Sequence, residues 1–198
     1  MILSKRFLSE QAKRRGITEY GQTEIVNENV RLALKYDVAQ EKNIKQYDIF
    51  LSHSSLDKKF VYTLVRLFNE VGYSVYVDWM VDTQLDRNNV NKDTAQVLRN
   101  RMNNSRGLSY VATANSSTSK WCPWELGYFD GKKNGRCCIL PIVESQTFLG
   151  QEYLGLYPFL DYAKNNLTGR QEFWVNNQDD GKHVTLKEWL AGKEPYMG

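Results

Sequence analysis

The chain has 198 residues, 41% hydrophobic and 13% aromatic, a composition that suits one domain with an attachment and excludes a disordered chain. Its formal net charge of +3 lies in residues 1–46, whereas the rest is neutral, so we expect no nucleic acid partner, which would require a basic face. No apolar run approaches the ~20 residues of a spanning helix, and the N-terminus lacks the apolar centre of a secretory signal, so we expect no membrane partner.

Cysteine and histidine are too sparse to indicate a disulfide framework or a metal site. The cysteines Cys122, Cys137 and Cys138 form an odd set without a C-x-x-C pair. His53 and His183 are the only imidazoles, so we expect no metal. Unpaired thiols are typical of a reducing compartment, and we therefore expect a cytoplasmic protein.

The first 46 residues are predicted to form a helical extension. The segment Leu3–Arg15 has apolar residues on one side of a helix, and Thr23 is a suitable N-cap for a second helix over Thr23–Asn43. We interpret residues 1–46 as an extension and 47–198 as the main domain. The extension packs either on that domain or on another subunit, and the sequence leaves both open.

The main domain opens with a strand, a helix and a strand. Tyr47–His53 is a nearly continuous apolar run, as in strands buried on both faces. Apolar residues then recur at helical spacing from Phe60 to Val71, and Gly72 ends the helix. Tyr73–Trp79 is the second predicted strand. A βαβ unit of this length favours a parallel sheet.

The pattern continues to the end of the chain. The polar segment Met80–Asp93 is predicted to be a long loop. The further predicted elements are a helix over Thr94–Asn104, a strand over Leu108–Thr113, a helix from about Cys122 to Gly135, a strand over Arg136–Val143, a fifth strand near Tyr157–Tyr162 and a closing helix over His183–Ala191.

Five strands alternating with helices predict an α/β fold with a doubly wound, open parallel sheet. One common strand order for such sheets is 2-1-3-4-5, and ligands bind where the winding reverses, beyond the carboxyl ends of strands one and three. Ser52, His53 and Ser54 lie at the end of the first strand, and residues 113–115 lie at the end of the third. We therefore expect a crevice between these two strand ends.

The segment Ser119–Leu126 is predicted to begin the helix that opens toward this crevice. Pro123 is typical of a helix start, so we expect Cys122 to cap the helix and Trp121 to lie in the loop before it. Glu125 would then lie in the first turn, where the helix dipole favours the charged carboxylate. A carboxylate beside an indole suits a ligand with a flat ring and positive charge. The alternative is an aromatic contact that only packs the helix start.

Other motifs are absent or ambiguous. The sequence has no G-x-G-x-x-G, P-loop or G-x-S-x-G pattern. His53 suits a general base, although a histidine at a strand end is more often structural. Trp79 suits a stacking platform, although a tryptophan there more often covers the core.

Three segments in order resemble the Toll/interleukin-1 receptor (TIR) domain. Tyr47–Lys58 resembles its first box, Val77–Trp79 the end of its second strand, and Ser119–Leu126 the box on its third helix, in which a Trp precedes a Glu-Leu pair. Cys138–Ile142 resembles its fourth strand. The resemblance covers residues 47–143 well, and it implies a flavodoxin-like, five-stranded parallel sheet.

The resemblance also implies an activity. Many bacterial TIR domains cleave NAD+ at the nicotinamide–ribose bond, and some make cyclic or conjugated ADP-ribose signals in anti-phage systems such as Thoeris. The catalytic residue of those enzymes is the glutamate at the position of Glu125. By position, the resemblance assigns substrate binding to Phe50, Ser52, His53, Ser54, Asp78, Trp79 and Trp121.

The implied partners are NAD+ as substrate rather than cofactor, other TIR subunits by self-association, and a downstream effector that senses the product. The sequence departs from the family at two places: Leu56 replaces the acidic residue usual before Asp57, and the loop Met80–Asp93, which in the family mediates assembly and completes the active site, lacks the usual Gly or Pro. The alternatives are a non-catalytic TIR–TIR scaffold or an enzyme similar to nucleoside deoxyribosyltransferases, which share the fold and a carboxylate.

Overall fold

The computed structural model describes residues 3–17, 46–82, 91–144, 152–177 and 180–197. The helix predicted for Thr23–Asn43 and the middle of the predicted Met80–Asp93 loop lie outside these ranges.

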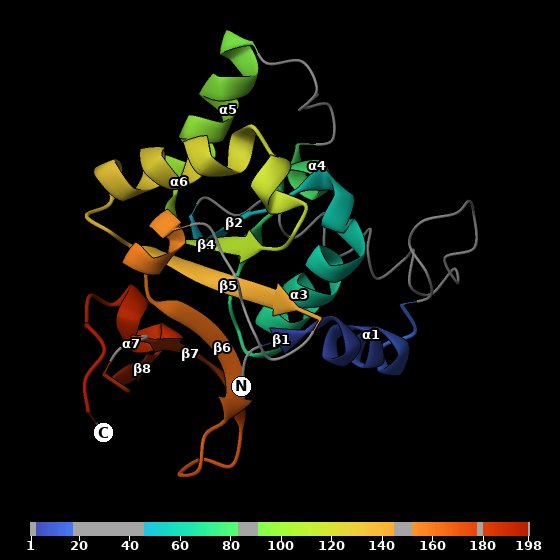
Figure 1. Ribbon diagram of the computed structural model, residues 1–198, viewed down its shortest axis with the longest axis vertical. Helices are drawn as coiled ribbons and strands as arrows, with labels where there is room; N and C mark the ends of the chain where they lie inside the picture. Colours follow the sequence, from blue (N-terminus) through green and yellow to red (C-terminus); the bar gives the residue numbers. More distant parts are fainter. Residues whose placement is uncertain (1–2, 18–45, 83–90, 145–151, 178–179, 198) are drawn as a thin grey trace.

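A parallel sheet forms the centre of the molecule (Figure 1). Its strands lie in the order β3-β2-β4-β5-β6, which confirms the predicted order 2-1-3-4-5 and places the reversal of winding between β2 and β4. The flavodoxin-like fold is therefore confirmed. The bounds of these strands are β2 Tyr47–Ser52, β3 Val75–Tyr76, β4 Ser105–Ala112, β5 Cys137–Val143 and β6 Phe159–Lys164.

The sheet extends beyond the five predicted strands. β7 (Gln171–Asn176) and β8 (His183–Thr185) add antiparallel strands after β6, so the sheet is mixed rather than wholly parallel. In β7, Phe173 and Val175 are buried while their neighbours are more exposed. This alternation of period two indicates a strand, and the sequence analysis missed it.

Two predicted elements have different bounds in the structure. The predicted strand Tyr73–Trp79 is short because Asp78 and Trp79 begin helix α4 (Asp78–Val81). The predicted helix His183–Ala191 begins as β8, and α7 (Leu186–Leu190) starts only after Thr185, whose hydroxyl accepts from the backbone N–H of Glu188. A Thr at that position satisfies a free N–H of the helix and so determines where the helix starts.

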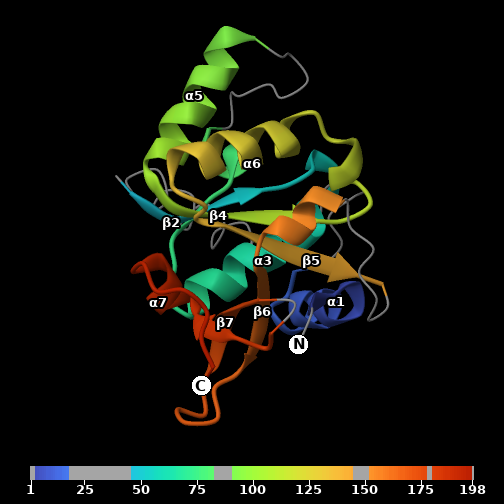
Figure 2. The ribbon, with the colours of Figure 1, turned by 60° about the vertical axis from the view of Figure 1, so that its left-hand side comes forward.

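The helices cover both faces of the sheet. α5 (Lys92–Asn103) and α6 (Trp121–Lys132) lie on one face of β2, β4 and β5, and α3 (Lys58–Glu70) lies on the other (Figures 1 and 2). β4 and β5 are almost entirely buried, as strands covered on both faces must be. Three 3-10 turns complete the described elements: η1 Ser55–Asp57, η2 Ser116–Thr118 and η3 Glu152–Leu156.

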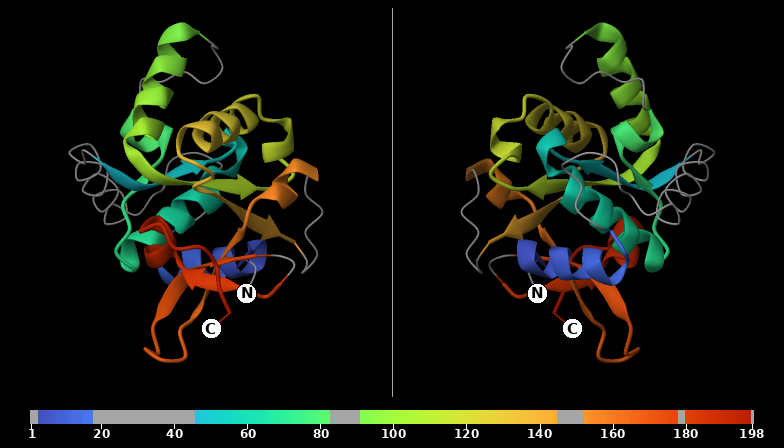
Figure 3. Two further views of the ribbon diagram at one scale, coloured as in Figure 1. Left: turned by 90° about the vertical axis from the view of Figure 1, so that its left-hand side faces the viewer. Right: turned by 90° about the vertical axis from the view of Figure 1, so that its right-hand side faces the viewer.

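The described part of the N-terminal extension packs on the main domain. Leu3–Ser4 is strand β1, which pairs in parallel with the end of β5, and α1 (Lys5–Arg14) follows. Leu3 was predicted to be helical, but α1 begins only after Ser4, whose hydroxyl caps it, and Leu3 is a strand residue that pairs with Ile142 of β5. Leu8 and Ala12 are buried, and α1 contacts α3, as Figure 3 shows from two sides.

Candidate active site

Helix α6 begins earlier than its proline indicates. Trp121 and Cys122 are its first two residues, and the hydroxyl of Ser119 accepts a 3.3 Å hydrogen bond from the backbone N–H of Cys122. Pro123 is still within the first turn, where its missing N–H costs nothing. The predictions that Cys122 caps the helix and that Trp121 precedes it are therefore wrong. Glu125, the fifth helical residue, lies in the second turn rather than the first, so the dipole acts on it less.

Glu125 is held at the end of the first parallel strand. Its side chain has no exposed surface, and its Oε2 accepts a 2.6 Å hydrogen bond from the hydroxyl of Ser52, the last residue of β2. α6 packs over β2, β4 and β5, which brings these two side chains together. We expected a carboxylate at the mouth of an open crevice. The carboxylate is instead enclosed, and a buried carboxylate is tolerated only where hydrogen bonds replace water.

His53, which follows β2, is also buried and has both ring nitrogens engaged. Nδ1 lies 2.8 Å from the carbonyl oxygen of Leu51, and Nε2 accepts a 3.0 Å hydrogen bond from the indole Nε1 of Trp79. A carboxylate oxygen of Asp78 lies 3.6 Å from Nε2. Because a carbonyl only accepts and an indole N–H only donates, both partners are satisfied when Nδ1 carries the proton and Nε2 does not. In this state His53 has no vacant nitrogen for general-base work.

Two other predicted site residues have structural contacts. Phe50 is 2% exposed and stacks on Tyr76 of β3, with ring centroids 5.1 Å apart. Ser54 caps η1, and its hydroxyl accepts from the backbone N–H of Leu56. The roles in substrate binding that the resemblance assigns to these two residues stay predictions.

Asp57 is a buried charge at the crevice to which the sequence analysis gave no site role. Its two carboxylate oxygens accept hydrogen bonds of 2.6 Å from the hydroxyl of Thr113 and 2.7 Å from the side-chain amide of Asn115. These contacts join the turn after β2 to the turn after β4. The sequence contained a pattern from which this role of Asp57 could have been predicted. A polar loop follows each of these two buried strands, and the ends of parallel strands meet at one edge of the sheet.

Trp121 belongs to a row of aromatic side chains on α6. It is 8% exposed and meets Trp124 edge to face at 5.4 Å between ring centroids. Trp124 in turn stacks on Tyr128, and the guanidinium of Arg99 from α5 lies 5.4 Å from the Trp124 ring centroid. Trp121 is thus mainly a packed residue here, close in sequence to Glu125 but largely enclosed.

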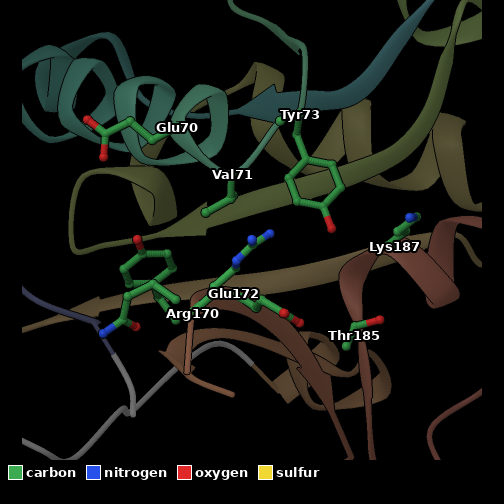
Figure 4. A pocket seen from close by; sticks show the side chains of 10 residues that line it. Glu70, Val71, Tyr73, Arg170, Glu172, Thr185 and Lys187 are labelled. Atoms are coloured by element: carbon green, nitrogen blue, oxygen red, sulfur yellow. The ribbon is translucent and has the colours of Figure 1, made fainter. Parts of the chain in front are cut away.

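A cleft of about 700 Å³ lies elsewhere, at the C-terminal end of α3, and none of the predicted site residues lines it (Figure 4). Glu70, Tyr73, Glu172 and Lys187 line it together with Arg170, whose side chain points toward the ring of Tyr73 in the figure. Burial, with the nearby carboxylates of Glu172 and Asp48, raises the pKa of Tyr73 to about 12. The lining mixes both signs of charge and shows no arrangement of nucleophile and base.

The described residues contain no group of three or more His, Cys, Asp or Glu side chains that could hold a metal ion. Within the same residues, no helix has the length and apolarity to cross a membrane. Cys122, Cys137 and Cys138 are buried thiols that form no disulfide, and burial raises the pKa of Cys138 to about 12. The thiolate is the reactive form of cysteine, so this raised pKa makes Cys138 an unreactive core residue.

Comparison with known proteins relates this geometry to a family. A family model described as the TIR domain matches residues 49–173. The chain is 44% identical over 153 residues to a Bacillus cereus (strain MSX-D12) protein named as a probable 3′ cyclic ADP-D-ribose synthase, ThsB′; the match covers 76% of this chain and 78% of that protein. It is 38% identical over 88 residues to a candidate cyclic ADP-D-ribose synthase, TIR2, of Cytobacillus dafuensis, covering 44% of this chain and 23% of that protein.

Proposed function

The chain belongs to the TIR domain family, and from that premise we propose that it cleaves NAD+ at the nicotinamide–ribose bond and makes a cyclic ADP-ribose signal. The names of the two relatives as cyclic ADP-D-ribose synthases support the product class. As in Thoeris, the signal would act in anti-phage defence in the cytoplasm, through an effector that senses it. The observation that carries the proposal is the buried Glu125 carboxylate, held by Ser52 where the winding of the sheet reverses.

One carboxylate suffices for this reaction. Ordinary glycosidases need a second carboxyl group to protonate the departing sugar oxygen. Nicotinamide leaves NAD+ as a neutral molecule because its ring nitrogen is already cationic, so the bond breaks without an acid. The positive charge passes to the ribose carbon, and the ionised Glu125 stabilises it electrostatically. A hydroxyl of the same molecule then adds to that carbon and loses its proton, which gives the cyclic product; water in its place gives ADP-ribose.

Ser52 supports Glu125 in this scheme. Its hydroxyl donates to one carboxylate oxygen and so restricts rotation of the side chain. A carboxylate aligned before the substrate arrives needs no reorganisation during the reaction, and this is where most electrostatic catalysis comes from. Because Glu125 is enclosed, the substrate reaches it only when neighbouring segments move. We propose that self-association of TIR subunits, which the family uses, produces that movement.

Glu125→Gln tests the proposal, because the amide keeps the shape and still accepts from Ser52 but lacks the charge. Purified wild-type protein and the variant are incubated with NAD+ at high protein concentration, and the nucleotides are separated by chromatography. We expect a rate lowered by about 10²- to 10³-fold, with unchanged circular dichroism. Glu172→Gln, which removes a carboxylate from the cleft in Figure 4, is the matched control and should retain full activity.

The same experiment separates the alternatives. If Glu125→Gln turns over NAD+ as fast as the wild-type protein, the assignment of Glu125 as the catalytic residue is wrong. Wild-type protein that self-associates but leaves NAD+ intact would favour a scaffold, and base exchange on deoxynucleosides would favour a deoxyribosyltransferase-like enzyme.

A further inference from the structure

We propose that His53 is a positioning residue that holds the indole of Trp79 as a platform for the positively charged ring of the substrate. The inference rests on the proposed function and names a part of the same site. It gives His53 a role other than the two that the sequence left open, a general base or a purely structural residue.

The orientation of Trp79 depends on a chain of two hydrogen bonds. The carbonyl of Leu51, within β2, fixes the imidazole through Nδ1, and Nε2 then accepts from the indole N–H at 3.0 Å. His53 is 1% exposed and therefore cannot turn away into solvent. A rigid strand thus determines the position of Trp79, which lies in the first turn of the short helix α4.

The face of Trp79 already attracts a cation. The ammonium of Lys58, at the start of α3, lies 5.6 Å from the ring centroid, within the range of a cation–π interaction. Trp79 is only half-buried, and Lys58 is exposed and has a long, flexible side chain. The carboxylate of Asp78 beside His53 adds negative charge to this neighbourhood. A flat cationic ring that displaces Lys58 would gain the same attraction together with stacking on the indole.

Nicotinamide in NAD+ is such a ring, whereas reduced NAD has a neutral ring of almost the same shape. A cation–π contact changes affinity by between about 2-fold and 30-fold, depending on how far the site excludes water. The difference in affinity between oxidised and reduced NAD for the same protein therefore measures the effect of the charge on the ring, because the rest of the ligand is the same in both forms.

The chain contains a matched control pair. Trp174 of β7 meets His183 of β8 edge to face at 5.5 Å between ring centroids, far along the sheet from β2. His183 is partly exposed, and its Nδ1 faces the carbonyl of Gly181 at 3.3 Å. This second Trp–His pair has no part in the proposed site, so its substitution measures the general effect of removing a histidine.

The first test needs no ligand. Nitrogen-15 NMR of the histidines in the full chain, assigned with His183→Gln, should show His53 at neutral pH with a proton on Nδ1 and none on Nε2. Trp79→Phe, which keeps a ring but removes the N–H donor, should shift the Nε2 signal. A charged imidazole, a proton on Nε2, or an Nε2 signal indifferent to Trp79→Phe would overturn the positioning role.

The second test is calorimetry in a Glu125→Gln background, which binds without fast turnover. We expect oxidised NAD to bind between about 2-fold and 30-fold more tightly than reduced NAD. Trp79→Leu should abolish that preference, His53→Leu should reduce it, and the double variant should lose no more than Trp79→Leu alone. His53→Gln, whose amide accepts from the indole and donates to the carbonyl, should restore part of it, and His183→Leu should leave it intact.

Equal affinities for the two forms, a preference that survives Trp79→Leu, or no binding of either form would overturn the platform. The failure of the proposed function is a separate result, since it would appear as NAD+ turnover by Glu125→Gln. If Glu125→Gln binds oxidised NAD more tightly than reduced NAD but also turns over NAD+ at the full rate, Trp79 keeps its role as the platform and Glu125 is not the catalytic residue.

Discussion

The two ends of helix α3 border regions of opposite character. Before its first residue, Asp57 belongs to a cluster of polar side chains at the strand ends, with Ser52, His53 and Glu125, in which each member is at most 2% exposed. At its last residue, Glu70 lines the open cleft of Figure 4, where charges of both signs lie near the surface. A helix of 13 residues, about 20 Å long, separates them.

The open cleft and the candidate active site therefore lie in different parts of the molecule and differ in how their polar groups are buried. Burying a charged or polar group costs stability unless hydrogen bonds replace its water, so such groups are concentrated where function requires them. At the strand ends, Glu125 is bonded to Ser52 and Asp57 to Thr113. In the cleft, Glu70 is paired with Arg15 of the N-terminal segment at the surface, an arrangement that needs no explanation beyond solubility and packing.

The largest expected difference in stability between the regions concerns Asp57. Asp57→Ala removes the buried acceptor of the partly buried donors of Thr113 and Asn115, and we expect a loss of about 1–3 kcal/mol in the free energy of unfolding. Glu172→Ala, in the cleft, should cost less than about 0.5 kcal/mol. Urea denaturation followed by circular dichroism measures both. Equal losses would mean that the two regions do not differ as described.

Ser52→Ala should show that the hydrogen bond from Ser52 to Glu125 raises the rate of the reaction. A hydrogen bond to a charged group is worth about 1.5–3 kcal/mol, so kcat should fall by roughly 10- to 150-fold, with little change in KM because Ser52 acts through Glu125. Ser52→Thr keeps the hydroxyl and should recover most of the activity. The prediction fails if KM rises while kcat is unchanged, because Ser52 would then contact the substrate directly.

The smallest effect is expected for the ion pair between Arg15 and Glu70. The hydrogen bond with Arg15 holds the pKa of the Glu70 carboxyl below its usual range. A lowered folded-state pKa contributes stability above the unfolded pKa of about 4.3, and this contribution is lost as the pH falls through the folded value. Glu70→Gln should therefore cost under about 1 kcal/mol at pH 7, because the pair is partly exposed.

The pH dependence of the stability lost in Glu70→Gln shows whether the loss comes from the ion pair with Arg15 or from packing. Thermal unfolding of wild type and Glu70→Gln at pH 7 and at pH 3 should show a difference that shrinks toward zero in acid. A difference that persists at pH 3 would mean that packing of α1 against α3, rather than the charge pair, depends on Glu70.

Several features could be predicted because neighbouring residues encode them. Tyr47–Ser52 is a nearly continuous apolar run, so its burial on both faces could be predicted, and Cys137–Val143 lies in an apolar run that was predicted as a strand. The alternation of strands with helices predicted a doubly wound sheet, for which the observed strand order is a common one. The motif around Glu125 was equally local, and it placed this residue at the same strand ends as Ser52. The family was therefore evident from the chain itself.

The remaining features depend on contacts between residues that are distant in the sequence. β1 is a strand only because it pairs with the end of β5, and Asp78 and Trp79 leave the predicted strand to enter α4, where Trp79 meets His53. Local pattern reports which side chains prefer burial, and it predicted the fold class, a common strand order that the structure confirms, and Glu125 as the candidate carboxylate. Only the tertiary structure decided that this carboxylate is enclosed and that His53 contacts the carbonyl of Leu51 and the indole of Trp79, because burial and hydrogen-bond partners are properties of the packed chain.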